Sequence, residues 1–422
     1  MSVLISENNN KLYSPMRTGP ALVRQNHRQP SDHGGHSRMR SLLPVALGAT
    51  LVLAFLPEQA SAHIKWFEPY DVSAVPASAD QVISTQFVLI LLGFTVLVFA
   101  GFLLDRLLAP RGGRLVGAML QREAAETLLR AGMGGFFMAL FATGGVILTP
   151  ELKSNADWLP WLQVGIAISL LSRRTCVLGG IGILLLYSYG VVQYGIFHLA
   201  DYPMFLGVAV YLGLTSSWSE RLRALRMPVL GVSICIGLMW GAVEKWAYPQ
   251  WTIPLLEARP YLTMGVPPRD VMIIAGFVEF SLAFYIMTGL SLVRLAILGL
   301  VMIFSAAILD FGKIDAIGHL PIVVPLLAMF VHGPNQVNRW FYDASAGLMT
   351  EARKASVGFA TSMCLLFAAY YGIQSAEYGH AAGRDDRVGL QRSSGLPVAV
   401  SSVVVASPAA VAAARPAGAE RS

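Results

Sequence analysis

Four long apolar runs between residues 227 and 332 constrain the fold more than any other feature of this sequence. They cover residues 228–243, 271–289, 292–309 and 317–331. Each run is close to the length that an α-helix needs to cross about 30 Å of hydrocarbon at about 1.5 Å per residue. The runs therefore predict a block of four membrane-spanning helices.

Composition extends this interpretation to the whole chain. Of its 422 residues, 55% are hydrophobic and 13% are charged, a balance typical of polytopic helical membrane proteins. Further spans are predicted at 87–104, 133–149, 158–172, 177–192, 204–215 and 357–373. The formal net charge of +6 could suggest nucleic-acid binding, but the Lys and Arg residues lie in loops beside apolar runs. We predict an all-α membrane protein with about ten transmembrane helices, whose partner is the lipid bilayer and not nucleic acid.

The N-terminal region has the pattern of a secretory leader. Residues 1–38 are polar, which predicts a disordered extension. Alternatively, the protein truly starts at Met39 and these residues lie upstream of its start. A basic start, an apolar run and the small residues that end at Ala62 predict a signal peptide over residues 39–62. Cleavage would make His63 the N-terminus of an extracytoplasmic arm, residues 63–86; without cleavage the apolar run remains as a signal anchor.

Arginine and lysine are unevenly distributed between the loops. If the arm lies outside, most of these residues fall on the inner side, among them Arg106, Arg173, Arg226 and Arg353. Cytoplasmic loops of membrane proteins carry such an excess. The sequence therefore predicts a multi-pass protein of the bacterial inner membrane with its mature N-terminus outside.

The spans divide the rest of the chain into successive parts. Residues 87–131 form a first transmembrane helix and an amphipathic surface helix at 113–130. They are followed by a four-helix unit at 132–226 and a second four-helix unit at 227–335. Residues 336–375 form a cytoplasmic loop and the last transmembrane helix, and residues 376–422 form a disordered tail. We expect this order of parts along the chain.

The two four-helix units share a spacing of marked residues. An arginine turn, at Arg173 in one unit and Arg294 in the other, precedes a histidine by about 24 residues. These histidines are His198 and His319, and a proline opens the next span in each unit. Because each unit has an even number of spans, a duplication would give two parallel units.

The second unit resembles the DoxX-like family of small four-helix membrane proteins. The resemblance rests on Glu244-Lys245 at the outer end of its first helix, on Gly276-Phe277-Val278-Glu279, and on Gly289 and Arg294. Some members of that family are associated with a thiosulfate:quinone oxidoreductase, so the resemblance implies contact with a quinone and a role in redox stress. The first unit departs from the pattern, because no Glu matches Glu279 and only Gln163 lies nearby.

Glu279 falls about 14 Å inside its predicted helix at the standard rise. A carboxylate inside a membrane is costly and normally faces the helix bundle or a water-filled cavity. Glu279 is therefore a candidate for a proton relay or a substrate contact, with Glu244 or Lys245 as its partner. The alternative is a protonated or paired carboxyl that only fixes helix packing.

Histidines on the outer side suggest a metal site. His63 with a free amine, together with His198 and His319, would offer nitrogen ligands suited to copper or zinc. The alternative is that His63 reflects only the cleavage position and the other two histidines cap helices. Nearby aromatic residues are predicted to form an interfacial belt: Trp246, Tyr248, Trp251 and Tyr261.

No sequence motif assigns a reaction or a catalytic residue. The first functional hypothesis is an accessory protein or subunit of an extracytoplasmic redox system, with a redox partner outside and copper bound through His63. A second hypothesis is a transporter or channel that uses Glu279. A third is an assembly factor of the membrane without a ligand of its own.

Overall fold

The computed structural model describes residues 70–71, 73–115, 122–343 and 345–392. In this part of the chain the secondary structure is helical, apart from one isolated β-bridge between Val146 and Lys153. Six of the described helices are long and apolar enough to cross a membrane, which is consistent with a multi-pass membrane protein. The predicted extension and signal peptide, residues 1–62, lie outside the described residues.

A first set of helices occupies residues 122–215. It consists of α5 (Arg122–Thr143), α6 (Leu159–Ser169), α7 (Cys176–Tyr194), the short α8 (Ile196–Leu199) and α9 (Pro203–Thr215). In chain order, α5 packs on α6, α6 on α7, and α7 on α9. The apolar helices α6 and α9 have only 11 and 13 residues, so each covers about 16–20 Å. Helix α6 is also shorter than the span predicted at 158–172.

A second set occupies residues 226–332 and follows the same order. Its long helices are α11 (Arg226–Ala247), α14 (Pro268–Thr288), α15 (Val293–Phe311) and α16 (Lys313–His332). The prolines between α11 and α14 begin two short helices, α12 (Pro249–Ala258) and α13 (Pro260–Thr263). Each long helix packs on the next one along the chain.

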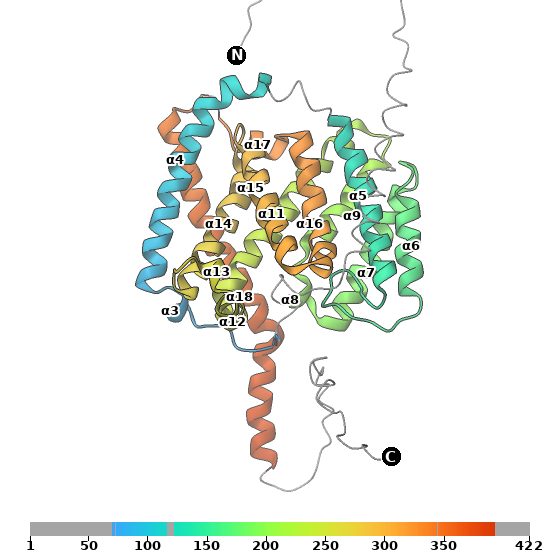
Figure 1. The fold of residues 1–422 in the computed structure, drawn as a ribbon, viewed down its shortest axis with the longest axis vertical. Helices are drawn as coiled ribbons and strands as arrows, with labels where there is room; N and C mark the ends of the chain where they lie inside the picture. Colours follow the sequence, from blue (N-terminus) through green and yellow to red (C-terminus); the bar gives the residue numbers. More distant parts are fainter. Residues whose placement is uncertain (1–69, 72, 116–121, 344, 393–422) are drawn as a thin grey trace, which may run out of the picture.

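The two sets meet through two extensive helix contacts. The last helix of the first set, α9, packs on the first helix of the second set, α11, and α16 packs in turn on α5. In Figure 1 the first set lies on the right and the second set fills the centre. The last helix of each set therefore contacts the first helix of the other.

Two long helices cover one side of this arrangement. They are α4 (Thr85–Leu115) and α18 (Leu348–Arg392), which pack against each other. On α4, the fully buried Asp105 accepts hydrogen bonds of 2.7–3.0 Å from the backbone N–H groups of Leu290, Ser291 and Leu292. Asp105 therefore fixes α4 to the turn between α14 and α15.

Three short helices complete the described chain: α3 (Ala79–Val82), α10 (Glu220–Ala224) and α17 (Gln336–Trp340). The C-terminal helix differs from the prediction of a disordered tail from residue 376, because α18 continues to Arg392 and extends beyond the end of the bundle (Figure 1). Once a helix is anchored, each further residue adds a backbone hydrogen bond at little cost, which accounts for the extension. The remainder of that tail lies outside the described residues.

The start of the first set also differs from the sequence prediction. Residues 122–130 belong to α5 and continue into the span predicted at 133–149, so in this region the predicted surface helix is not a separate element. The helix ends at Thr143, before Gly144 and Gly145, whose φ angles are 71° and 63°. Glycine adopts this left-handed conformation without steric cost, which explains why the helix stops earlier than its apolar run.

Aromatic side chains form the core where α4, α11, α14 and α18 meet. The Trp246 ring stacks on Phe367 with centroids 5.6 Å apart and contacts Phe87 and Phe277 at 5.2 and 4.7 Å. Trp246, Tyr248 and Trp251 are all buried, so their assignment to an interfacial belt was wrong. These rings pack against other helices, whereas Tyr261 is exposed.

Candidate functional site

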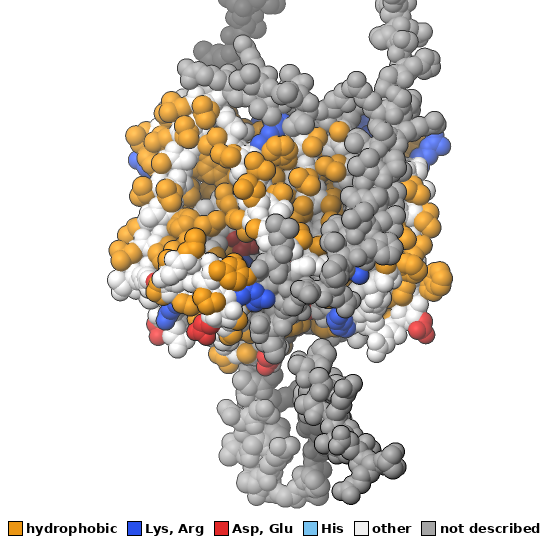
Figure 2. Space-filling model, in the orientation of Figure 1, with side chains coloured by type: hydrophobic (Ala, Val, Ile, Leu, Met, Phe, Trp, Pro, Cys, Tyr) orange, Lys and Arg blue, Asp and Glu red, His pale blue; other side chains and the backbone are white. Residues whose placement is uncertain are grey.

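A cavity of about 420 Å³ lies within the second set of helices. Most of its wall is apolar, and charged side chains are confined to a few positions. The lining includes Gly237, Gly241, Glu244 and Lys245 of α11, Ala275, Val278 and Glu279 of α14, Leu300, Ile303 and Phe304 of α15, and Gly318, His319 and Ile322 of α16. In the face of the molecule that Figure 2 shows, acidic and basic side chains lie in the largely hydrophobic middle.

Helical periodicity explains why α11 and α14 line the same space. The lining residues Gly237, Gly241 and Lys245 are four apart on α11, and Ala275 and Glu279 are four apart on α14. Residues at this spacing lie on one face of a helix. Gly241 leaves room in the cavity, because a Cβ atom there would meet only Oε1 of Glu279, at 4.0 Å. At Gly237 a Cβ atom would instead lie 3.2 Å from Pro203 of α9, so this glycine allows α11 and α9 to approach closely.

An ion pair joins these two helices inside the cavity. The Nζ atom of Lys245 lies 2.6 Å from Oε2 of Glu279, with side chains that are 26% and 16% exposed. The ammonium also lies 3.3 Å from the backbone oxygen of Gly241, one turn earlier. Of the two partners considered for Glu279, the structure pairs it with Lys245, while Glu244 lines the same cavity without this contact.

His319 is oriented by a carboxylate from its own helix. Its Nδ1 atom lies 2.9 Å from Oδ2 of Asp315, one turn earlier on α16, and both side chains are buried. The ring also packs against Phe304, with centroids 5.0 Å apart. Such a carboxylate fixes the position of the imidazole and the tautomer that it adopts, so His319 is held at the cavity wall in a defined orientation.

The first set of helices also reaches this cavity. Asp201, Tyr202 and Met204, at the junction of α8 and α9, line it. The Nε1 atom of Trp240 donates a 2.8 Å hydrogen bond to Asp201, and the buried Tyr202 hydroxyl donates to Glu151. With Asp201, the lining contains three acidic residues, the others being Glu244 and Glu279, and one lysine, Lys245.

Of the three histidines of the predicted metal site, His198 and His319 are among the described residues and His63 is not. His198 is not part of the cavity wall that contains His319. His198 is buried between the rings of Tyr70 and Tyr194, each 5.5 Å away. No group of three or more His, Cys, Asp or Glu side chains suited to a metal was found within the described part of the chain.

Sequence reasoning missed the buried carboxylates of the first set. Glu126 is buried on α5, within a segment predicted to be a surface helix, and Glu151 lies in the loop after that helix. Both have arginine or tyrosine partners that are distant in sequence, Arg226 and Tyr202. An isolated glutamate near a loop carries no local signal of such a partner, so only the fold reveals these pairs.

No protein-family model, no curated protein and no solved structure matches this chain.

Proposed function

We propose that this protein is a membrane subunit of an extracytoplasmic redox system and that its cavity binds the ring of a quinone. The observation that carries this proposal is the combination of an apolar cavity with Lys245, Glu279 and His319 in its wall. Small-molecule sites are mostly apolar spaces of about 300–1,000 Å³ with a few polar groups that orient the ligand. At about 420 Å³, the cavity falls in this range.

The polar groups match the chemistry of a quinone ring. Each ring carbonyl oxygen accepts hydrogen bonds, and the Lys245 ammonium and the His319 imidazole are donors. Glu279 holds the ammonium in place, and Asp315 holds the imidazole. The apolar residues of α15, such as Ile303, would contact the remainder of the ring.

The reciprocal packing of the two sets supports a duplicated architecture of two parallel four-helix units with about ten spans in all. The two arginine turns have related partners: the Arg173 backbone oxygen accepts from Ser216 at the end of α9, and Arg294 Nε donates to the Phe330 oxygen in the last turn of α16. In this arrangement the end of the bundle that carries α3 and α12 faces outward from the bacterial inner membrane.

Transport is a second candidate function, and the Lys245–Glu279 pair favours it. Charged pairs inside a membrane mark substrate and proton pathways in many transporters. Two parallel repeats around a central contact would suit such a mechanism. Flux that is lost in Glu279→Gln, in a protein that binds no quinone, would favour transport over the redox role.

Copper binding through the N-terminal histidine also stays a proposal. Tyr70 contacts His198, and the seven Cα–Cα steps from His63 to Tyr70 can span at most about 25 Å. His319 has the carboxylate partner that histidine ligands of metals usually have. Elemental analysis of protein matured in its own membrane should give about one copper per chain and none in His63→Ala; a metal-free wild type would exclude the site.

Equilibrium binding of a short-chain quinone to purified protein tests the main proposal. We expect saturable binding near one per chain, weakened at least about tenfold in Lys245→Met and in Glu279→Gln, since each loses a hydrogen bond to a charged group. Lys354→Met is the matched control, because Lys354 pairs with Glu351 and Asp343 away from the cavity. Equal binding by all four proteins would contradict the proposal.

A further inference from the structure

A second cavity, of about 310 Å³, lies at the other end of the helices. It forms where α5 and α11 begin and α9 ends, beside the short helix α10 and the turn after α6. Its lining includes Arg173, Arg223, Arg226, Glu126, Tyr211 and His332. The cavity therefore belongs to both sets of helices and is separate from the proposed quinone site.

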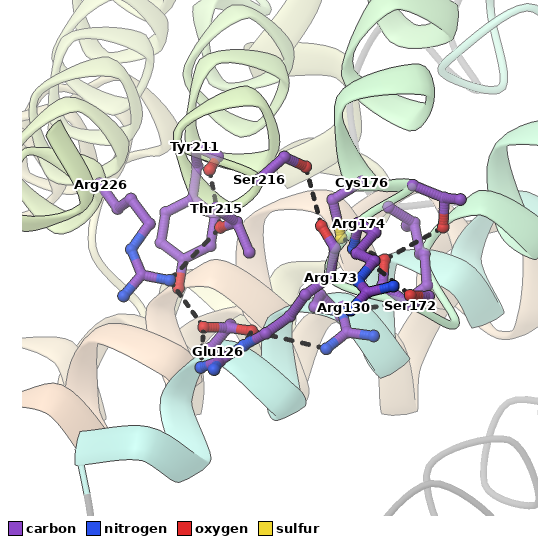
Figure 3. Close-up of polar contacts among 12 residues, drawn as sticks. Glu126, Arg130, Ser172, Arg173, Arg174, Cys176, Tyr211, Thr215, Ser216 and Arg226 are labelled. Carbon is purple, nitrogen blue, oxygen red and sulfur yellow. Dashed lines mark hydrogen bonds and ion pairs between the residues drawn. The ribbon is translucent and has the colours of Figure 1, made fainter. Parts of the chain in front are cut away.

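One buried carboxylate holds several arginines around this cavity. Glu126, with a side chain only 5% exposed, accepts from Nε and Nη2 of Arg173 at 2.5 and 2.6 Å. It also accepts from Nη1 of Arg226 at 2.6 Å, and Arg130 lies 3.5 Å away. Figure 3 shows these guanidinium groups converging on Glu126. The carboxylate thus fixes guanidinium groups that come from three different segments of the chain.

Positive charge exceeds negative charge at this site. The lining has three arginines, Arg173, Arg223 and Arg226, and two glutamates, which leaves one positive charge when His332 is neutral. Arg130 pairs with Glu126 from outside the lining and adds a second positive charge. Glu220 is 91% exposed and its 3.6 Å pair with Arg223 is therefore screened by solvent. A guanidinium has five N–H donors, so Arg223 and Arg226 retain donors beyond the contacts they make. An anion with several oxygens, such as a phosphate, fits this surplus.

Exposed apolar side chains lie on the segment that lines this cavity. Trp218, just before α10, is 95% exposed. Leu222 within α10 and Leu225 directly after it are 45% and 36% exposed. Tryptophan is enriched where a protein meets the lipid headgroups. An arginine cavity flanked by exposed apolar side chains has the two parts of a lipid site, one for the phosphate and one for the acyl chain.

We propose that this cavity binds the phosphate group of an anionic phospholipid. Basic pockets between transmembrane helices are a recurrent form of headgroup recognition. The phosphate would lie between Arg223 and Arg226, and the acyl chain would pass along Leu222 and Leu225. Free phosphate has the same oxygens, and the test below separates the two sources.

Native mass spectrometry of detergent-purified protein with added phosphatidylglycerol or phosphatidylcholine tests this inference. We expect one phosphatidylglycerol to be retained per wild-type chain in preference to phosphatidylcholine. Arg223→Gln should weaken that retention about fivefold, because one cation is lost beside the phosphate. Arg223 makes no contact with Glu126, so this variant leaves the buried cluster intact, whereas Arg226→Gln tests both roles together.

Arg221→Gln provides the matched control, since Arg221 is exposed on the same short helix and is not part of the cavity lining. It should retain the lipid as the wild type does. Equal losses in Arg221→Gln and Arg223→Gln, or no loss in either, would overturn the inference. Displacement of the lipid by millimolar inorganic phosphate would also overturn it, and would identify free phosphate as the ligand.

Discussion

The Nζ atom of Lys245 lies 2.6 Å from a carboxylate oxygen of Glu279 and joins α11 to α14 within the larger cavity. Removing either partner should destabilise the fold, because the charge of the other residue would remain largely shielded from water. The pair also places two protonatable groups against an otherwise apolar wall. The same contact thus contributes to helix packing and gives the cavity its polar end.

Breaking this pair on one side should be worse than removing both charges. We expect Glu279→Leu alone or Lys245→Met alone to lower the free energy of unfolding by about 1–3 kcal/mol. The loss can fall at the lower end of this range because both side chains are partly exposed, so water can solvate the charge that remains. The double variant should recover part of that loss. Thermal unfolding in detergent, followed by tryptophan fluorescence, gives the order of the four proteins. Additive losses would show that the two charges do not stabilise each other.

Gly276 should tolerate no side chain, because its α14 backbone lies directly against the Trp246 indole. A Cβ atom at Gly276 would lie 2.5 Å from Nε1 of Trp246, whose ring is held between Phe277 and Phe367. We expect Gly276→Ala to lower the free energy of unfolding by about 1–3 kcal/mol through overpacking. The same thermal measurement checks this expectation.

Gly372 on α18 is the matched control for that substitution. A Cβ atom there meets nothing within 4 Å, so Gly372→Ala should be neutral or stabilise the helix by up to about 1 kcal/mol. If Gly276→Ala and Gly372→Ala unfold at the same temperature, α14 does not pack closely against Trp246.

Asp105 should be among the least replaceable carboxylates outside the cavity. It accepts three backbone N–H groups of the turn between α14 and α15 and pairs with Arg106 at 3.0 Å. We expect Asp105→Ala to cost about 2–4 kcal/mol of stability, because these buried donors would lose their acceptor. Protease resistance of the folded protein should fall with it, whereas Glu220→Gln, at an exposed position, should change neither. An unaltered Asp105→Ala protein would contradict the assigned contact.

The apolar runs of the second unit predicted its helices well, because their length and hydrophobicity are local properties. The run at 317–331 lies within α16, and that at 228–243 within α11. Glu279 was also recognisable from the sequence, since a carboxylate in an apolar run is conspicuous. Its pairing with Lys245 followed from helix packing, which the sequence alone left open.

Other features were hidden because they depend on distant contacts. Trp246 has the composition signal of an interfacial residue, yet it is buried by Phe87 and Phe367, which come from helices far away in the chain. Glu126 was assigned to a surface helix because charges flank it, although Arg173 and Arg226 enclose it in the fold. In both cases, tertiary partners decide the environment of the side chain.

Photo-crosslinking with an azido-quinone, followed by peptide mapping, shows whether the larger cavity binds a quinone. We expect the label to attach to residues of the cavity wall on α11, α14 or α16 and excess short-chain quinone to suppress the labelling. In Glu279→Gln the label should fall strongly, while in Lys354→Met it should stay unchanged. Labelling confined to the outward apolar faces of α4 and α18, insensitive to competing quinone, would show that the cavity is not a quinone site.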